Sequence, residues 1–142
     1  MPLDPRAKRF LDRLAALNPP SVLALTVSER RSGLQQLLSF AGPGESVAQV
    51  EERTLPGPSG MSLTLRIYRP AAVPAAAPAL VYFHGGGLVA GSLDTHDPIC
   101  RALSNASGCV LFSVDYRLAP EFPFPAAIAD GCHATEIGRA HV

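Results

Sequence analysis

Three glycines beside a histidine form the part of this sequence with the clearest chemical meaning. His84, Gly85, Gly86 and Gly87 follow directly on the apolar run 79–83, which is typical of a buried strand. Because glycine has no side chain, the N–H groups of such a turn can point outward and approach a ligand closely. Donors fixed in this way stabilise the negative charge that forms on a carbonyl oxygen during acyl transfer, and losing one costs about 3 kcal/mol. The pattern therefore predicts an oxyanion-binding loop.

Two nucleotide-binding motifs compete for the same glycines. Gly85-x-Gly87-x-x-Ala90 formally fits the dinucleotide fingerprint, but that motif requires a helix to begin at the glycines. Gly91 and Pro98 interrupt the stretch, and Asp115 follows roughly 30 residues later instead of about 20. A phosphate-binding P-loop is excluded because no lysine follows Gly91.

Two helices are predicted ahead of the loop and two after it. Asp4 is a good N-cap for a helix whose apolar residues recur at helical spacing as far as Leu17. Thr26 and Glu29 have the spacing of a capping box, which places the start of a second helix. Pro125 is suited to the first turn of a further helix.

The strands between these helices predict a mixed sheet. Residues 47–55 and 61–69 are separated by a turn, and the second run alternates apolar and polar, so we expect an antiparallel pair. Residues 79–83 and 109–114 are unbroken apolar runs, typical of strands covered on both faces. A predicted helix over 97–107 lies between them, so these two strands should be parallel and joined by a right-handed crossover. The expected fold class is α/β.

The composition limits the classes of partner that this protein can bind. The 142 residues are 47% hydrophobic, enough for one domain, and 12 basic side chains balance 12 acidic ones. No basic block indicates a nucleic-acid partner or a membrane surface. Charged residues near the N-terminus interrupt any signal peptide, and no apolar run approaches the roughly 20 residues that span a bilayer. We therefore expect a cytoplasmic protein with small neutral ligands.

Neither disulfides nor metals are predicted. The three cysteines form no C-x-x-C pair and lie in apolar or helix-like contexts, so we expect reduced core thiols at Cys100, Cys109 and Cys132. Asp94, His96 and Asp97 have no second ligand cluster. Asp94 or Asp97 is more simply explained as a helix N-cap.

The loop and the blocks that follow it resemble one family. His84 to Ser92, Cys100 to Leu103 and Asp115 to Ala127 together look like the bacterial hormone-sensitive-lipase-like esterases, the alpha/beta hydrolase fold-3 family. The resemblance covers about Leu3 to Thr135. It implies an α/β-hydrolase fold in which 1–44 forms cap helices and 45–135 the N-terminal part of the core.

The same resemblance implies roles for the loop residues. Gly85 and Gly86 would supply the oxyanion-hole N–H groups, Gly87 would permit close packing, and His84 would orient the loop without acting as a base. The implied substrate is a small acyl ester. No cofactor is implied, and dimers are common among such proteins, so a homodimer is expected of the complete protein.

Four further residues bear on the surroundings of the site. Arg117 and Glu121 would be buried ion-pair or hydrogen-bond partners that hold their loop in place. Leu88 stands where the family often has an aromatic residue, and Phe122 where it often has histidine. Both departures concern the acyl pocket more than the reaction.

The nucleophile of this chemistry is not among the 142 residues. The family's triad of Ser, Asp and His follows the glycines in that order, with the serine in a G-x-S-x-G turn. No serine here has both glycines, and the nearest, Ser59, has Met61 at the second position. We therefore expect a truncated chain without esterase turnover. The alternative is a non-catalytic, ligand-binding homologue, as plant gibberellin receptors are within this fold.

The final segment offers a reason for truncation. Residues 136–142 can be encoded by the start of a widely used short-read sequencing adapter, whose next three bases are a stop codon. We therefore expect 136–142 to be a non-native tail and the genuine gene sequence to end at about Thr135.

Overall fold

The computed structural model describes residues 3–18, 20–40, 42–73 and 78–140. Four helices and four strands carry the fold, with short 3-10 turns at Val22–Ala24 and Pro58–Gly60. In chain order they are α1 (Pro5–Ala16), α2 (Val27–Ser39), β1 (Gln49–Pro56), β2 (Ser62–Arg69), β3 (Ala79–Phe83), α3 (Asp97–Ser107), β4 (Val110–Asp115) and α4 (Ala126–Ala140).

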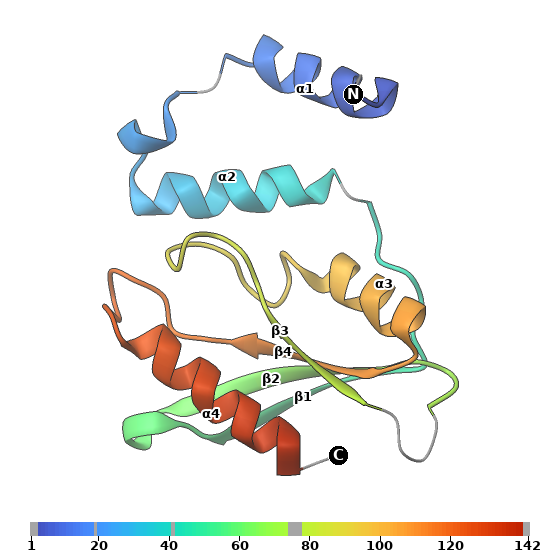
Figure 1. Ribbon diagram of the computed structural model, residues 1–142. Coiled ribbons are helices and arrows are strands. Elements are labelled where there is room, and N and C mark those ends of the chain that lie inside the picture. Colours follow the sequence, from blue (N-terminus) through green and yellow to red (C-terminus); the bar gives the residue numbers. More distant parts are fainter. Residues whose placement is uncertain (1–2, 19, 41, 74–77, 141–142) are drawn as a thin grey trace.

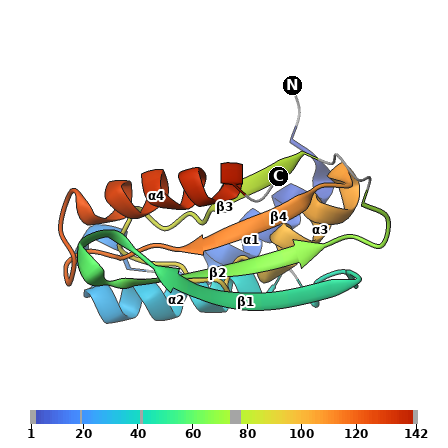
Figure 2. The same ribbon diagram turned by 90° about the horizontal axis from the view of Figure 1, so that it is seen from below.

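The strands form one mixed sheet in the order β1-β2-β4-β3. β1 pairs with β2 and β2 with β4 in antiparallel fashion, whereas β3 and β4 are parallel. Figure 2 shows the four strands side by side. The expected antiparallel pair and the expected parallel unit around α3 are therefore both confirmed.

Helices cover both faces of the sheet. α3 packs against β2 and β4, and α4 packs against β3 and β4. Figure 1 shows α2 and α3 on one side of the sheet and α4 on the other. α1 lies beyond α2, where Phe10 and Phe40 meet edge to face with ring centroids 6.3 Å apart.

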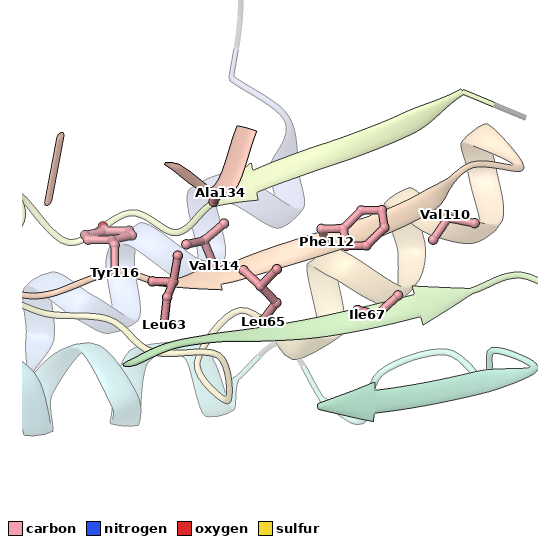
Figure 3. Packing of buried hydrophobic residues seen from close by; sticks show 8 residues of the cluster. All are labelled: Leu63, Leu65, Ile67, Val110, Phe112, Val114, Tyr116 and Ala134. Carbon is pink, nitrogen blue, oxygen red and sulfur yellow. The ribbon is translucent and has the colours of Figure 1, made fainter. Parts of the chain in front are cut away.

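The larger core lies between the sheet and α4. Alternate residues of β2 and β4 point to this face, because side chains along a strand alternate between its two sides. The cluster in Figure 3 consists of Leu63, Leu65, Ile67, Val110, Phe112, Val114, Tyr116 and Ala134. The intervening positions Tyr68 and Leu111 face the other way and pack with Cys100 of α3.

The two parallel strands differ in burial, although both are apolar. β4 is buried from Val110 to Val114, as the sequence predicts. β3 is not covered on both faces: Leu80 is 36% exposed and Phe83 43%. The reason is position, because β3 is the end strand of the sheet within the described residues and pairs only with β4. A free apolar strand edge is a template for further pairing.

The helix caps agree with the sequence at the first two helices. The Asp4 carboxylate accepts the Arg6 N–H at 2.7 Å, and Thr26 and Glu29 form the reciprocal capping box. Within the residues that the structure describes, no helix is long and apolar enough to cross a membrane.

The three cysteines are free thiols, but only two of them lie in the core. Cys100 and Cys109 are buried, and Cys132 on α4 is exposed. The expectation of a core position for Cys132 is wrong. Burial raises the pKa of the Cys100 thiol to about 11, so this group stays protonated at neutral pH.

Candidate active site

The glycine loop begins where β3 ends. Gly86 has φ +131° and Gly87 has φ +65°, values that residues with a side chain rarely adopt. A Cβ on Gly86 would overlap the carbonyl group of Ala90, while one on Gly87 would meet open space. The close packing that the resemblance assigned to Gly87 therefore falls at Gly86. At Gly87, glycine is favoured by its backbone conformation.

The three glycine N–H groups are not equivalent. The Gly85 N–H donates to Nε2 of His96 over 3.3 Å. In the described part of the chain, no acceptor receives the N–H of Gly86 or of Gly87. Both residues are exposed. The loop therefore presents two adjacent free donors rather than three.

His84 fastens the loop to the end of β4. Its ring is 4% exposed and stacks on Tyr116 with centroids 4.3 Å apart. The Tyr116 hydroxyl donates to the His84 carbonyl, and His84 Nδ1 lies 3.0 Å from the Gly85 carbonyl oxygen. His84 Nε2 is buried without a hydrogen-bond partner among the described residues. These contacts tie His84 to the Tyr116 side chain after β4 and to the backbone of the adjacent Gly85.

Arg117 is paired, but with a residue that sequence reasoning missed. Its guanidinium forms a two-pronged contact with Asp130 of α4, with Nη2 2.7 Å from Oδ1 and Nε 2.9 Å from Oδ2. The Arg117 backbone N–H also donates to Oδ2 at 2.9 Å. Burial alone would raise the pKa of Asp130, but the hydrogen bonds from Arg117 outweigh it and lower the pKa.

Glu121 is paired with α2 instead. Arg31 donates from Nη2 to Oε2 at 2.7 Å and from Nη1 to Oε1 at 2.9 Å. These bonds lower the pKa of Glu121 to about 2. The Glu121 side chain is 51% exposed, so the expectation of a buried pair is wrong for this residue. Glu121 lies in a surface loop and contacts Arg31 at the surface of the molecule.

Arg31 also holds the glycine loop. Its Nε donates to the Val89 carbonyl at 2.8 Å and its Nη2 to the Ala119 carbonyl at 3.2 Å. One side chain thus joins α2, the loop after β3 and the loop after β4. No sequence motif marked Arg31, because its partners lie far along the chain.

Two hollows beside the glycine loop are lined by residues that the structure describes. The larger, of about 570 Å³, lies between β3 and α4 and is lined mainly by apolar groups, among them Phe83, Leu88 and Ile128. The smaller, of about 230 Å³, lies between Gly87, Leu88 and the segment from Ala119 to Pro125. We call the second the loop hollow. Leu88 lines both, whereas Phe122 lines the loop hollow and packs under the Arg117 guanidinium at 5.7 Å.

Asp94, ahead of α3, and Asp97, its first residue, do not cap this helix. The N-cap is His96, and its side chain makes no capping bond. The Asp97 carboxylate accepts from Arg101 at 2.6 Å and from the Tyr68 hydroxyl at 2.9 Å, and Asp94 accepts from Arg66 at 2.7 Å. The expectation of a cap is wrong because side-chain donors from β2 and α3 take these carboxylates. Among the described residues, no group of three or more ligand-type side chains is placed to hold a metal.

Known proteins resemble this chain in sequence and in structure. Residues 80–142 match the family model described as alpha/beta hydrolase fold. Esterase LipI of Mycobacterium tuberculosis is 49% identical over 95 residues, covering 66% of this chain and 29% of LipI. Carboxylesterase NlhH of the same organism is 39% identical over 148 residues, covering 96% of this chain and 44% of NlhH.

A solved structure extends the likeness to the fold. The hyperthermophilic esterase from the archaeon Pyrobaculum calidifontis superposes with a TM-score of 0.85 at 41% identity, over 96% of this chain and 44% of that one. The chain spans less than half the length of each of these three relatives. It has the α/β-hydrolase fold and belongs to the alpha/beta hydrolase fold-3 family, the hormone-sensitive-lipase-like esterases.

Proposed function

We propose that the complete protein is a carboxylic ester hydrolase and that residues 84–87 form its oxyanion-binding loop. The observation that supports this most directly is the pair of exposed N–H groups of Gly86 and Gly87, which have no acceptor in the described structure. The Gly85 N–H is already bonded to His96. We therefore place the donor pair at Gly86 and Gly87, one residue later than the resemblance implied.

The reaction is acyl transfer to a serine and then to water. A serine hydroxyl adds to the ester carbonyl carbon, the carbonyl oxygen becomes an oxyanion, and collapse of the adduct releases the alcohol. Water then adds to the acyl-enzyme and releases the acid. The N–H groups of Gly86 and Gly87 would hold the oxyanion in both steps. The 142 residues contain no G-x-S-x-G turn, so the nucleophile must come from outside them.

The substrate class follows from the loop hollow. Its volume is about 230 Å³, and Leu88, Phe122 and Phe124 make its wall apolar beside Gly87. Such a site favours a small neutral acyl group. At this wall Leu88 places an aliphatic side chain where the family often has an aromatic one.

We propose the domain division from the same contacts. Residues 1–44 would belong to the cap, because Arg31 of α2 reaches over the glycine loop to Val89. Residues 45–135 would belong to the hydrolase core. The proposal that residues 136–142 are a non-native tail rests on their possible coding by a sequencing adapter and not on a contact, and the family match extends to residue 142. A cytoplasmic location is supported by the free cysteines. A homodimer is proposed from the family resemblance alone.

The test begins with the gene. Resequencing the locus from genomic DNA should show a G-x-S-x-G codon pattern after residue 135, and the purified complete gene product should hydrolyse short-chain p-nitrophenyl esters. Replacing the serine of that turn by alanine should abolish turnover. If a full-length gene lacks the triad and its product binds esters without turnover, the protein is a binding homologue and the proposed function is wrong.

A matched pair of variants tests the loop itself. Gly87 and Gly108 have φ values of +65° and +67°, and a Cβ on either meets nothing within 4 Å. Alanine at either position should therefore cost a similar backbone strain, on the order of 1–2 kcal/mol. Alanine keeps the N–H of residue 87, but its methyl group would border the loop hollow where the substrate binds. Only Gly87→Ala should therefore lower kcat/KM, by roughly 100-fold, because a shift of about 1 Å between the donors and the substrate can cost that much. Equal activities of the two variants would refute the donor assignment.

A further inference from the structure

His96 is the one side chain that bonds to the backbone N–H of the glycine triplet within the described residues. Its Nε2 receives the Gly85 N–H at 3.3 Å, and its Nδ1 lies 2.9 Å from the Thr95 hydroxyl oxygen. An imidazole can accept at Nε2 only if that nitrogen carries no proton. The contact therefore depends on the tautomer and charge of His96.

The hydrogen bonds of Thr95 select the tautomer. The Thr95 hydroxyl donates to the Ser92 carbonyl at 2.9 Å and accepts the Ser92 N–H at 2.8 Å. A hydroxyl has one hydrogen to donate, so toward His96 it can only accept. Nδ1 must therefore carry the proton of the neutral ring, which leaves Nε2 as the acceptor for Gly85.

The surroundings of His96 favour the neutral ring. The ring is half-buried and packs near Tyr82 of β3 and His84, with centroids 6.1 and 5.5 Å away. Burial lowers the pKa of His96, and the nearby His84 lowers it further, against a smaller opposing effect of the Ser92 backbone.

The charged groups around the turn are engaged elsewhere. Asp94 is paired with Arg66 of β2 at 2.7 Å. Asp97 binds Arg101 of its own helix at 2.6 Å and also lies 3.5 Å from Arg66. Neither carboxylate has a hydrogen bond to the His96 ring that would stabilise its cation.

We propose that His96 is a positioning residue of the oxyanion loop, which anchors Gly85 through neutral Nε2 so that the N–H groups of Gly86 and Gly87 stay free. This inference rests on the proposed function for its catalytic meaning, although the contact itself does not. A His96 cation would present N–H donors at both nitrogens and lose the Gly85 bond. Anchoring should therefore weaken as pH falls through the pKa of His96.

The first test needs no variant and no activity. In the complete gene product labelled with ¹⁵N-histidine and ¹⁵N-glycine, NMR spectra should show His96 protonated at Nδ1 and bare at Nε2 at about pH 8. The Gly85 amide should then shift with a midpoint equal to the His96 pKa, below about 6.5. The inference would be overturned if His96 were protonated at Nε2, or if the chemical shift of the Gly85 amide did not change as His96 titrates.

Two variants of similar size separate anchoring from mere packing. His96→Gln keeps an oxygen that can accept from Gly85 and does not titrate, whereas His96→Leu removes the acceptor. At about pH 8 we expect His96→Gln to keep kcat within roughly threefold, and His96→Leu to lose roughly 10- to 100-fold in kcat with little change in KM. In His96→Gln the pH-dependent shift of the Gly85 amide should disappear.

The matching pair at His133 is the control. The Nε2 of His133 lies 2.8 Å from the Pro56 carbonyl oxygen, at the end of β1 rather than at the glycine loop. Neither His133→Gln nor His133→Leu should change kcat or the pH-dependent shift of the Gly85 amide. If His96→Leu is as active as His96→Gln, the inference is refuted. A product without ester hydrolysis that still shows the coupled titration would refute the proposed function while supporting the His96 contact.

Discussion

Two arginine–carboxylate pairs hold the segment after β4, and they differ mainly in their contact with water. The side chains of Arg117 and Asp130 are 17% and 2% exposed. Those of Arg31 and Glu121 are 36% and 51% exposed. Both pairs are two-pronged and equally short, at 2.7 Å. Geometry alone therefore does not show which pair contributes more to stability. Burial does, because water screens the charges of an exposed pair.

The two pairs also join different parts of the molecule. Arg117 and Asp130 link the end of β4 to α4, so they belong to the packed body around the core. Arg31 and Glu121 link α2 to the loop after β4, outside that body. The comparison indicates that the buried pair maintains the fold, whereas the exposed pair places the N-terminal helices over the site.

The largest effect is expected from Asp130→Asn. The change leaves the Arg117 guanidinium partly buried without its counter-charge, which costs about 3 kcal/mol in such pairs. Urea unfolding of the complete gene product should show this as a lower midpoint with an unchanged slope. A loss as small as that of Glu121→Gln would remove the distinction between the two pairs.

Arg31→Ala should act on the site more than on global stability. It removes the bonds to Glu121 and to the carbonyls of Val89 and Ala119 together. We expect faster amide hydrogen exchange in α2 and a fall of roughly tenfold in kcat/KM, since the glycine loop loses one of its supports. Arg31→Lys keeps the positive charge but loses the two-pronged guanidinium contact, so both effects should be intermediate.

Glu121→Gln should have a smaller effect than Arg31→Ala. Arg31 would lose the charge of its partner but keep its two carbonyl acceptors, and the pair is exposed. Amide exchange in α2 should increase by less than half as much as in Arg31→Ala. An equal increase in both variants would show that the carbonyl bonds contribute nothing.

The smallest effect concerns acid. Because Arg31 lowers the pKa of Glu121 to about 2, the stabilisation by this pair is complete above the unfolded pKa of about 4.3 and is lost as pH falls toward 2. NMR titration of the Glu121 carboxyl should give a midpoint near 2, and a higher midpoint in Arg31→Ala, because the hydrogen bond from Arg31 is the largest cause of the lowered pKa. A normal midpoint in the unmodified protein would show that the pair is absent in solution.

Local sequence rules predicted most of the secondary structure. The capping box of Thr26 and Glu29, the β1–β2 hairpin and the helix over 97–107 all appear as expected, because each depends on neighbours within a few residues. The same rules failed at Asp94 and Asp97. A free carboxylate at either position could cap the helix, but both carboxylates form ion pairs with arginines of β2 and α3 instead.

Long-range pairing was beyond those rules. Arg117 and Glu121 were both expected to have partners, but nothing in the sequence indicated that these are Asp130 and Arg31, the latter 90 residues from Glu121. The exposure of Cys132 and of Phe83 likewise depends on which elements lie against α4 and β3. Apolar character by itself could not show that β4 is central and β3 lies at the end of the sheet.

The sequence by itself determined the glycine loop, the strand that leads into it and the family to which they belong, because an apolar run that ends in three glycines and the motif blocks that follow it are local patterns that require no tertiary contact. Only the tertiary structure decided which donors are free. His96 takes the Gly85 N–H, leaving those of Gly86 and Gly87. That choice follows from the packing of the turn 92–96 against the loop, and hydrogen bonds between distant segments form only once the chain has folded.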